Sequence, residues 1–343
     1  MALTDWRSLH GEHFDGRRVL VTGGAGFIGS HLCEALVELG AEVVVIDDLS
    51  GGDTTNFATF QDAAGERLQF IQGCILDREL LDQAVRGCAY VFHQAALGSV
   101  PRSIELPSRY VAVNITGTLN VLEAARANGV RRLVLASSSS IYGDSPTLPK
   151  VESMALRPKS PYAASKAADE MLLRSHADCY DLDTVSLRYF NIFGPRQNAN
   201  SAYAAVIAAF AKALGEGTAP VIFGDGEQSR DFTFVENAVH ANLLAARAEG
   251  PLRGEAMNVA CGERITVNQL ATAMAARYGQ PDVQPVYQPI RAGDVRDSLA
   301  DLSLAGQRIG YQPIIPFEQG LDATVQWYQE QSGQRNAEPT ARA

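Results

Sequence analysis

Tyr162 and Lys166 have the residue types and the spacing of an acid–base pair, within residues 160–166 (SPYAASK). Residues four apart on a helix share one face, so the two side chains can meet. The pKa of a free tyrosine is about 10, so a base working near pH 7 needs about 4 kcal/mol of relative stabilisation of its phenolate. A cation about 6 Å away supplies roughly 2.8 kcal/mol at an effective dielectric constant of about 20. The spacing alone is also that of a chance surface pair, so a second feature is needed.

A glycine-rich segment, residues 22–29 (TGGAGFIG), supplies that feature, because it follows a short apolar run and opens a helical pattern. Spaced glycines permit a tight turn and close approach of the backbone to a pyrophosphate, which the helix N-terminus attracts. The alternative is a tight turn without a ligand. The expected cradle residues are Gly23, Gly26, Phe27, Ile28 and Gly29.

Asp47 stands 18 residues after Gly29, where a carboxylate accepts hydrogen bonds from an adenosine ribose. Its alternative role is to cap a helix. Neither Arg nor Lys follows through Gly52, so a 2′-phosphate would be repelled. The sequence therefore predicts NAD rather than NADP, and its positive nicotinamide ring would add to the charge of Lys166 in stabilising the Tyr162 phenolate.

A run of serines in residues 136–143 (ASSSSIYG) follows the strand that precedes the Tyr–Lys segment. A hydroxyl just past the carboxyl end of a strand lies at the crevice where doubly wound folds bind ligands. Four consecutive serines, residues 137–140, leave the choice of catalytic hydroxyl open, and a polar turn is the alternative.

Elements that could position these residues alternate along the first half of the chain. Short Val/Ile/Leu-rich runs at 18–22, 42–47, 68–72, 90–92, 133–136 and 184–187 predict buried parallel strands. Helical segments are expected at 27–39, 78–86, 108–128 and 161–180. The fold class is therefore α/β, a doubly wound parallel sheet of the Rossmann type with a smaller mixed α/β C-terminal lobe.

This alternation gives predicted domain boundaries. Residues 1–190 form the dinucleotide-binding domain, to which the segment 232–262 returns with a helix and a strand. Residues 191–331, where Gly and Pro become denser, form the substrate lobe. The polar residues 332–343 are expected to be a flexible tail.

Composition narrows the class of protein. The net charge of −10 disfavours nucleic acid and anionic membranes as partners. We find neither a membrane-spanning apolar run nor a signal peptide, and five scattered cysteines indicate neither disulfides nor zinc. The six histidines show no metal-ligand spacing, so no metal is expected, and His93 is interpreted as a packed, hydrogen-bonded residue. These features predict a cytoplasmic protein.

The order of the glycine-rich segment, serine run and Tyr–Lys pair resembles the extended short-chain dehydrogenase/reductases. Within that superfamily, residues 17–329 resemble UDP-sugar 4-epimerases. Residues 93–103 (HQAALGSVPRS) and 201–207 (SAYAAVI) are more specific, since they resemble the bacterial branch that acts on UDP-N-acetylhexosamines for surface polysaccharides.

The resemblance implies roles residue by residue. Ser138 is the substrate-binding serine, Tyr162 the base and Lys166 its partner, while Asn114 helps to hold the active-site helix. The resemblance adds Ala95, Tyr162 and Lys166 to the residues expected to bind the cofactor. The implied substrate-binding residues are Gly98, Ser99, Ser138, Ser139, Ser140, Asn191, Ala205, Val206, Arg230, Arg291, Asp294 and Ser298.

Three of these have specific tasks in the resemblance. Arg230 and Arg291 clamp the diphosphate, although from the sequence alone each could equally be an exposed ion-pairing residue. Asp294 holds the uridine ribose.

One departure concerns Cys74, which lies near a position where the family often has an Asp that bonds adenine. Because a thiol is a weak acceptor, NAD retention is expected to be weaker.

The implied reaction is epimerisation at C4 through a 4-keto intermediate, between UDP-N-acetylglucosamine and UDP-N-acetylgalactosamine. Ser298 is small where a Tyr often restricts relatives to glucose and galactose. Alternatives are a UDP-glucose/UDP-galactose or UDP-hexuronate epimerase, or a lyase of the dehydratase or decarboxylase type. The lyases carry carboxylates where this chain has Ser139 and Ser140. The resemblance also implies a homodimer through residues 108–128 and 161–180.

Overall fold

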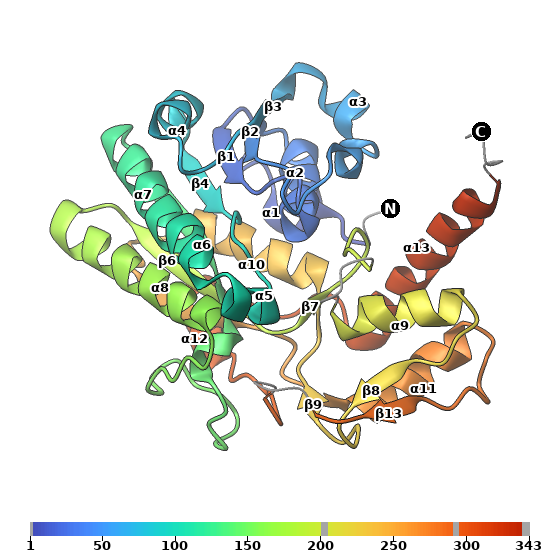
Figure 1. Ribbon diagram of the computed structural model, residues 1–343. Coiled ribbons are helices and arrows are strands. Elements are labelled where there is room, and N and C mark those ends of the chain that lie inside the picture. The colour runs from blue at the N-terminus through green and yellow to red at the C-terminus, as the bar shows by residue number, and fades with distance from the viewer. Residues whose placement is uncertain (1–2, 200–204, 291–294, 338–343) are drawn as a thin grey trace.

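A central parallel sheet organises the molecule (Figure 1). The computed structural model describes residues 3–199, 205–290 and 295–337, and within them seven strands form this sheet in the order β3-β2-β1-β4-β5-β6-β11. Every neighbouring pair is parallel, for example Leu20 opposite Val44 and Val91 opposite Leu133. The strands are β1 (Arg18–Thr22), β2 (Glu42–Asp47), β3 (Leu68–Gln72), β4 (Tyr90–His93), β5 (Arg132–Ser138), β6 (Thr184–Tyr189) and β11 (Glu255–Val259).

Helices cover both faces of the sheet, because apolar side chains of each strand point alternately to the two sides. One face, with Leu20, Val91 and Leu133, packs against α4 (Arg78–Val85), α7 (Gly117–Ala127) and α8 (Pro161–Tyr180). The other packs against α2 (Phe27–Glu38), α10 (Val235–Arg247) and α12 (Ser303–Ile309). The doubly wound α/β prediction is confirmed.

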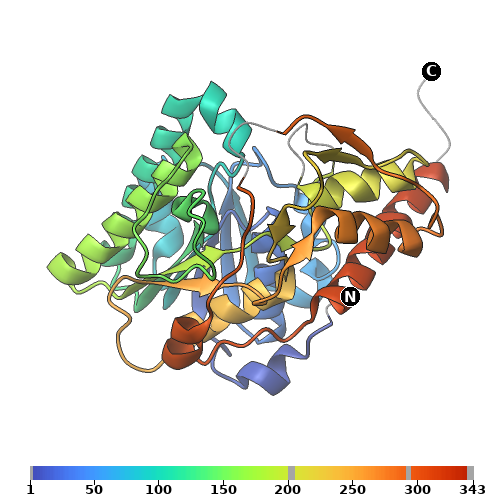
Figure 2. The same ribbon diagram turned by 90° about the horizontal axis from the view of Figure 1, so that it is seen from below.

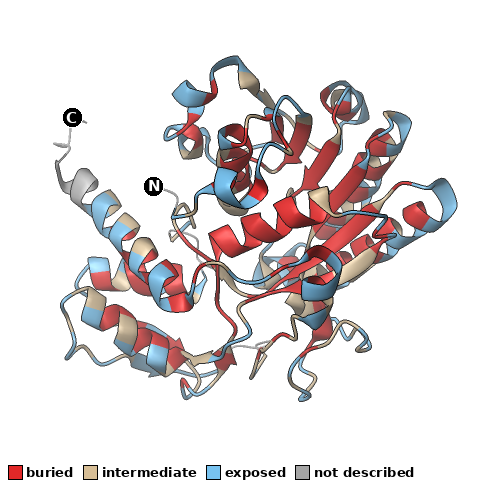
Figure 3. Ribbon diagram, turned by 180° about the vertical axis from the view of Figure 1, so that it is seen from behind, coloured by how far each residue is buried: buried red, intermediate tan, exposed pale blue. Residues whose placement is uncertain are grey.

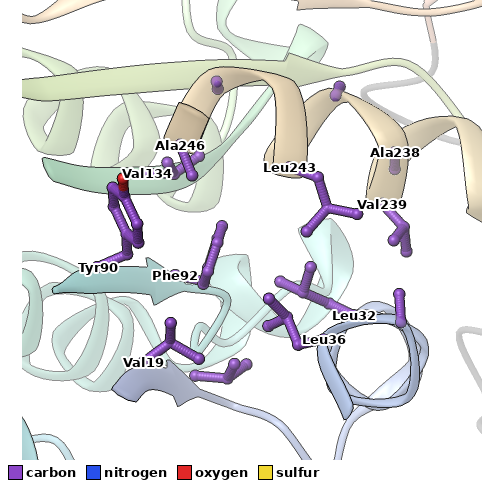
Figure 4. Packing of buried hydrophobic residues seen from close by; sticks show 14 of the residues in the cluster. Val19, Leu32, Leu36, Tyr90, Phe92, Val134, Ala238, Val239, Leu243 and Ala246 are labelled. Atoms are coloured by element: carbon purple, nitrogen blue, oxygen red, sulfur yellow. The ribbon is translucent and has the colours of Figure 1, made fainter. Parts of the chain in front are cut away.

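Helix α10 is buried along nearly its whole length, as Figure 3 shows. In Figure 4, its side chains Val239 and Leu243 face Leu32 and Leu36 of α2 and Phe92 of the sheet. Burying one such leucine contributes about 1.5–3 kcal/mol. Thus residues 235–259, far along the chain, supply both an inner helix and the edge strand β11 of the central sheet.

A second cluster of buried apolar side chains forms a smaller lobe beside the sheet, visible in Figures 1 and 2. Phe210, Leu270 and Leu321 bring together its three main helices. These helices are α9 (Val206–Gly215), α11 (Val267–Arg277) and α13 (Phe317–Ala337). Paired short strands complete it: β7 (Ile192–Phe193) with β10 (Thr233–Phe234), β9 (Ser229–Arg230) with β12 (Ile265–Thr266), and β8 (Val221–Phe223) with β13 (Val286–Gln288).

The helix predicted over 108–128 is present as a continuous helical segment from Pro107 to Ala127, but its middle is π-helical. It consists of α6 (Pro107–Tyr110), a π-helical stretch η3 (Val111–Thr116) and α7. The sequence of η3, VAVNIT, is rich in β-branched residues, which lower helix propensity. A π-turn of this kind often marks a functional position, and η3 contains Asn114.

Helices lie near both ends of the described chain. Near the N-terminus, α1 (Trp6–His10) buries Trp6 in the apolar cluster on the sheet face that α2, α10 and α12 cover. At the other end, α13 continues to Ala337 and so includes the first residues of the segment 332–343 that is predicted as a tail. The remaining short elements are η1 (Thr54–Phe57), α3 (Gln61–Ala64), η2 (Gly65–Arg67), α5 (Val100–Glu105) and η4 (Ser139–Tyr142).

The order of the strands fixes where a ligand can enter. The chain runs outward from β1 to β3 and then crosses back to β4, on the other side of β1. The loops after β1 and β4 therefore diverge at the carboxyl end of the sheet and leave a crevice there. None of the helices within the described residues is long and apolar enough to cross a membrane.

Candidate active site

A cavity of about 430 Å³ lies at this crevice. Its wall contains all of the residues predicted to bind the cofactor, together with Gly98 and Ser99 from the predicted substrate set. Those cofactor residues are Gly23, Gly26, Phe27, Ile28, Gly29, Asp47, Ala95, Tyr162 and Lys166. The structure thus brings the glycine-rich turn and the Tyr–Lys pair, some 140 residues apart in sequence, to one cavity.

The turn after β1 depends on glycine at two positions. Gly23 has φ of +70°, and a Cβ on it would lie 2.6 Å from the backbone nitrogen of Ala95. A Cβ on Gly29 would lie 2.1 Å from the carbonyl oxygen of Gly23. Gly26 is the N-cap of α2, so the free N–H groups at that helix end face the cavity wall. Such a cradle suits a pyrophosphate.

Asp47 ends β2 and lines the cavity beside the turn. Its carboxylate accepts hydrogen bonds from the backbone N–H groups of Ala25 at 3.0 Å and Leu49 at 2.8 Å. Burial raises the pKa of Asp47, while these two bonds oppose the rise. The carboxylate therefore holds the turn in place, and its position at the wall fits the predicted ribose contact.

Cys74 lines the far part of the same cavity, between Gly73 and Ile75. The local sequence places a thiol there, where the resemblance implies an adenine contact. Other wall residues were not predicted, because their approach depends on the tertiary fold. They are Ile46, Asp48, Ser50, Gly51, Gly52, Gly73, Ile75, Gln94, Ala96, Leu97, Arg102, Leu106, Arg109, Tyr110, Val113, Ala136 and Tyr189. Ser137, one of the four candidate serines, also lines the wall.

Helix α8 positions Tyr162 and Lys166 at its first turns. Ser160 caps this helix by accepting a hydrogen bond from the N–H of Ala163 at 3.1 Å, and Pro161 occupies its first turn. The ring of Tyr162 meets that of Tyr110 edge-on, with centroids 6.5 Å apart. These contacts fix the helix end that carries the pair.

Asn114 of η3 links this helix to the cavity wall. Its side-chain amide donates to the Ser165 hydroxyl at 2.9 Å, and its carbonyl oxygen accepts from the N–H of Leu97 at 2.9 Å. Because the amide is buried, these bonds hold α8 against the loop that follows β4.

The four serines of the run differ in their surroundings, since Ser137 is buried and Ser138, Ser139 and Ser140 are half-buried. Ser137 lines the cavity and donates its hydroxyl to Glu170 at 2.5 Å. Ser138 caps η4 by accepting from the N–H of Ser140 at 3.2 Å. The Ser140 hydroxyl is buried and has no hydrogen-bond partner among the described residues. Ser138, Ser139 and Ser140 do not line the cavity as the described residues define it.

Three residues predicted to bind substrate lie near one another outside this cavity. The amide of Asn191 donates to the Ser298 hydroxyl at 3.5 Å, and Ser298 N–H bonds the carbonyl of Ser229, next to Arg230. One guanidinium nitrogen of Arg230 donates to the carbonyls of Ser229 and Arg296.

Two further predicted substrate residues begin helix α9. Ala205 is the N-cap of α9, and Val206 is its first residue. Arg291 and Asp294 lie outside the described residues. Within the described part of the chain, we find no group of three or more His, Cys, Asp or Glu side chains that could hold a metal ion.

The residues of the cavity fit NAD. A Cβ at Gly23 or Gly29 would collide with backbone, so glycine is required for the tight turn that leads to the N-terminus of α2, where a pyrophosphate can bind. The ammonium of Lys166 is buried at the wall without a hydrogen-bond partner among the described residues, which suits a ribose hydroxyl.

Comparison with known proteins gives a consistent result. The model of the NAD dependent epimerase/dehydratase family matches residues 19–260. A UDP-glucose 4-epimerase from Mycolicibacterium smegmatis is 39% identical over 318 residues, which cover 92% of this chain and 99% of that protein.

Solved structures agree with the sequence match. A UDP-N-acetylglucosamine 4-epimerase from Methanobrevibacter ruminantium M1, in complex with UDP-N-acetylmuramic acid, has a TM-score of 0.87 and 41% identity, covering 92% of this chain and 99% of that one. A dTDP-glucose 4,6-dehydratase from Streptomyces venezuelae, with NAD bound, has a TM-score of 0.85 and 32% identity, covering 92% and 98%.

The matched residues 19–260 include the glycine-rich turn, Asp47, the serine run and the Tyr–Lys pair. The glycine-rich turn, Asp47 and the Tyr–Lys pair line the cavity where the fold predicts a dinucleotide site, and the similarity extends over nearly the whole chain. The chain therefore belongs to the NAD-dependent epimerase/dehydratase family of extended short-chain dehydrogenases/reductases, as an isomerase that uses NAD.

Proposed function

We propose that this protein is a UDP-sugar 4-epimerase that interconverts UDP-N-acetylglucosamine and UDP-N-acetylgalactosamine. One observation carries the proposal: Tyr162 and Lys166 line the same cavity as the glycine-rich turn and Asp47. A base and a dinucleotide cradle in one cavity are what reversible oxidation of a sugar hydroxyl requires.

In this reaction Tyr162 accepts the proton of the sugar 4-hydroxyl as C4 is oxidised. After the 4-keto sugar has rotated to present its other face, C4 is reduced and Tyr162 returns the proton. Lys166 favours the phenolate of Tyr162 by its charge and bonds the nicotinamide ribose. Bound NAD supplies the hydride acceptor and donor. Ser138 bonds the sugar hydroxyl.

The side chains near the serine run favour epimerisation over elimination. The lyases of this superfamily need a carboxylic acid or carboxylate next to the catalytic serine, and this chain has Ser139 and Ser140 there. Neither hydroxyl can serve as the acid that expels water at neutral pH. Epimerisation needs only the proton transfer at Tyr162.

The choice of sugar rests on small side chains. Ser298 is 9% exposed and lies beside Asn191, and Gly98 and Ser99 are small residues of the cavity wall. Small residues leave room for a 2-acetamido group, whereas a tyrosine at 298 would fill that space. UDP-glucose/UDP-galactose and UDP-hexuronates are the competing substrate pairs.

The diphosphate of the sugar nucleotide needs local positive charge in a chain of net charge −10. Arg230 and Arg291 are proposed to clamp it, and Asp294 to hold the uridine ribose. Asn191, Ala205 and Val206 complete the proposed substrate site. A guanidinium pair is suited to this task because it bonds phosphate oxygens bidentately.

The proposed assembly is a homodimer through η3, α7 and α8. Large apolar side chains are exposed on these helices, including Met171 at 62%, Tyr180 at 53% and Val111 at 50%. Exposed apolar side chains gathered on neighbouring helices are typical of an interface.

We also propose a cytoplasmic location. All five cysteines are free, and they lie within the described residues. Unpaired thiols persist in a reducing compartment, whereas disulfides form in an oxidising one.

The test is a panel of UDP-sugars, each incubated with the protein with and without added NAD and followed by proton NMR of the anomeric region. A new galacto-configured anomeric signal from UDP-N-acetylglucosamine supports the proposal. Turnover of UDP-glucose or UDP-glucuronate alone would reassign the substrate. A 4-keto-6-deoxy product or release of CO2 would reassign the reaction to a lyase.

A further inference from the structure

A buried carboxylate that the mechanism above does not use lies next to Lys166. The Oδ2 atom of Asp169 is 3.5 Å from Lys166 Nζ, and the two side chains are 0% and 3% exposed. Neither carboxylate oxygen of Asp169 has a hydrogen-bond partner among the described residues, and the same holds for Lys166 Nζ. Each charge is therefore compensated chiefly by the other.

The neighbouring acid, Glu170, has a different task. Its carboxylate accepts two hydrogen bonds from the Arg188 guanidinium, at 3.0 and 2.8 Å, and a third from the Ser137 hydroxyl. Glu170 thus joins α8 to the ends of β5 and β6. Glu170 is already paired with Arg188, so Asp169 is the carboxylate that pairs with the Lys166 ammonium.

Two further groups of the described residues near Asp169, the Thr118 hydroxyl and the His93 imidazole beyond it, are uncharged. Burial raises the pKa of the Asp169 carboxyl to about 6, and the Lys166 ammonium and the Thr118 hydroxyl of α7 oppose this rise. Thr118 also bonds His93 at 2.9 Å, and burial keeps the pKa of that imidazole at about 3, so it is neutral. The other ring nitrogen of His93 bonds the hydroxyl of Thr22, next to the glycine-rich turn.

We propose that Asp169 is the buried counter-ion of Lys166 and a positioning residue for the Tyr162–Lys166 pair. Removing a buried cation from water is costly unless an anion accompanies it. Asp169 supplies that anion from the side of Lys166 that faces α7. It thereby holds the ammonium in place and limits how strongly its charge acts on Tyr162.

The direction of this effect on Tyr162 can be derived. Tyr162 and Asp169 are seven residues apart on α8, which is about 10 Å along the helix axis. A unit charge at about 10 Å shifts a pKa by about one unit at an effective dielectric constant of about 20. The Asp169 charge disfavours the phenolate, so Asp169→Asn should lower the pKa of Tyr162 by about one unit.

The experiment is an absorbance titration of the phenolate band in the NAD-loaded protein. Each spectrum is referenced to the same protein carrying Tyr162→Phe, so that the difference reports Tyr162 alone. The expected result is a midpoint about one unit lower in Asp169→Asn than in the wild type, with the acidic limb of the pH–rate profile moving the same way.

Two variants serve as controls. Asp178→Asn removes an exposed carboxylate of the same helix, which pairs with Arg174, and should leave the midpoint unchanged. Asp169→Glu keeps the charge and should restore the wild-type midpoint.

An unchanged or higher midpoint in folded Asp169→Asn would overturn the proposal, because a purely structural role alters stability without moving this titration. The inference rests on the proposed function only in taking Tyr162 as the base. The titration needs no turnover, so its result is independent of which UDP-sugar is the substrate.

Discussion

At the scale of single residues, Tyr162 carries the chemistry of the proposed mechanism. The change Tyr162→Phe removes the proton acceptor and keeps the ring that packs against Tyr110. We expect kcat to fall by about 10²- to 10⁴-fold, the usual contribution of a general base. Affinity for the UDP-sugar, measured by calorimetry, should stay within about two-fold. A near-normal rate would show that another group takes the proton.

Ser298 is the residue with which we test the choice of sugar. Replacing it by Tyr fills the space beside Asn191, and overpacking of about 1–3 kcal/mol corresponds to roughly a 5- to 150-fold loss of kcat/KM for UDP-N-acetylglucosamine. Activity on UDP-glucose should be retained. Ser298→Ala is the matched control, since it removes only the hydroxyl. Equal losses for both sugars in Ser298→Tyr would argue against a role in specificity.

Some residues of the candidate site were predictable from the sequence and others were not, for a physical reason. Tyr162 and Lys166 were predictable because their relation is local, four residues on one helix. Arg102 and Arg109, which line the cavity, were not, because their approach depends on how α5 and α6 pack. The ion pair of Asp169 is also local, but its burial became evident only with α7 in place.

At the scale of elements, the central strands were predictable because buried parallel strands are continuous apolar runs. The helix expected over 108–128 is present, but periodicity does not reveal the π-helical turn around Asn114. That turn places the Asn114 amide against Ser165 of α8. The π-helical turn, which departs from regular α-helix, therefore carries the side chain that helps to position α8 at the candidate site.

The N-terminal segment, residues 3–16, is held by a buried histidine pair. The Nε2 atom of His10 lies 3.0 Å from Nδ1 of His240, and burial lowers their pKa values to about 3 and about 4. Arg247 and His13 add to the depression at His10. In the unfolded chain both imidazoles take up protons near pH 6.5, so the unfolded state binds more protons between that pH and the folded pKa values.

We therefore expect stability to fall as the pH decreases below about 6.5, by up to about 2.7 kcal/mol per pH unit where both histidines contribute. Fluorescence of Trp6 in a Trp327→Phe background follows the release of the segment, and chemical denaturation measures the free energy of unfolding. His10→Phe with His240→Leu should make this dependence less steep without abolishing it, because burial also lowers the pKa values of His31 and His93 to about 3. An equally steep pH dependence in the double variant would rule out the pair as its source.

At the scale of the whole molecule, the exposed apolar side chains of η3, α7 and α8 predict a dimer. Light scattering should give twice the chain mass of 36.8 kDa. Met171→Lys places a charge in this surface and should shift the mass towards that of one chain. Ile290→Lys, at an exposed apolar position of the second lobe, should not. A monomeric wild-type protein would exclude the proposed interface.

The architecture also defines the most direct test of the central claim, that the Tyr162 cavity performs reversible oxidation at C4 of a UDP-sugar. The substrate is UDP-N-acetylglucosamine carrying deuterium at C4, and the products are followed by NMR and mass spectrometry in ordinary water. We predict UDP-N-acetylgalactosamine that keeps its deuterium at C4, because the hydride leaves and returns within one cavity. Loss of the label to solvent, or its transfer to C6 of a 4-keto-6-deoxy sugar, would contradict the account.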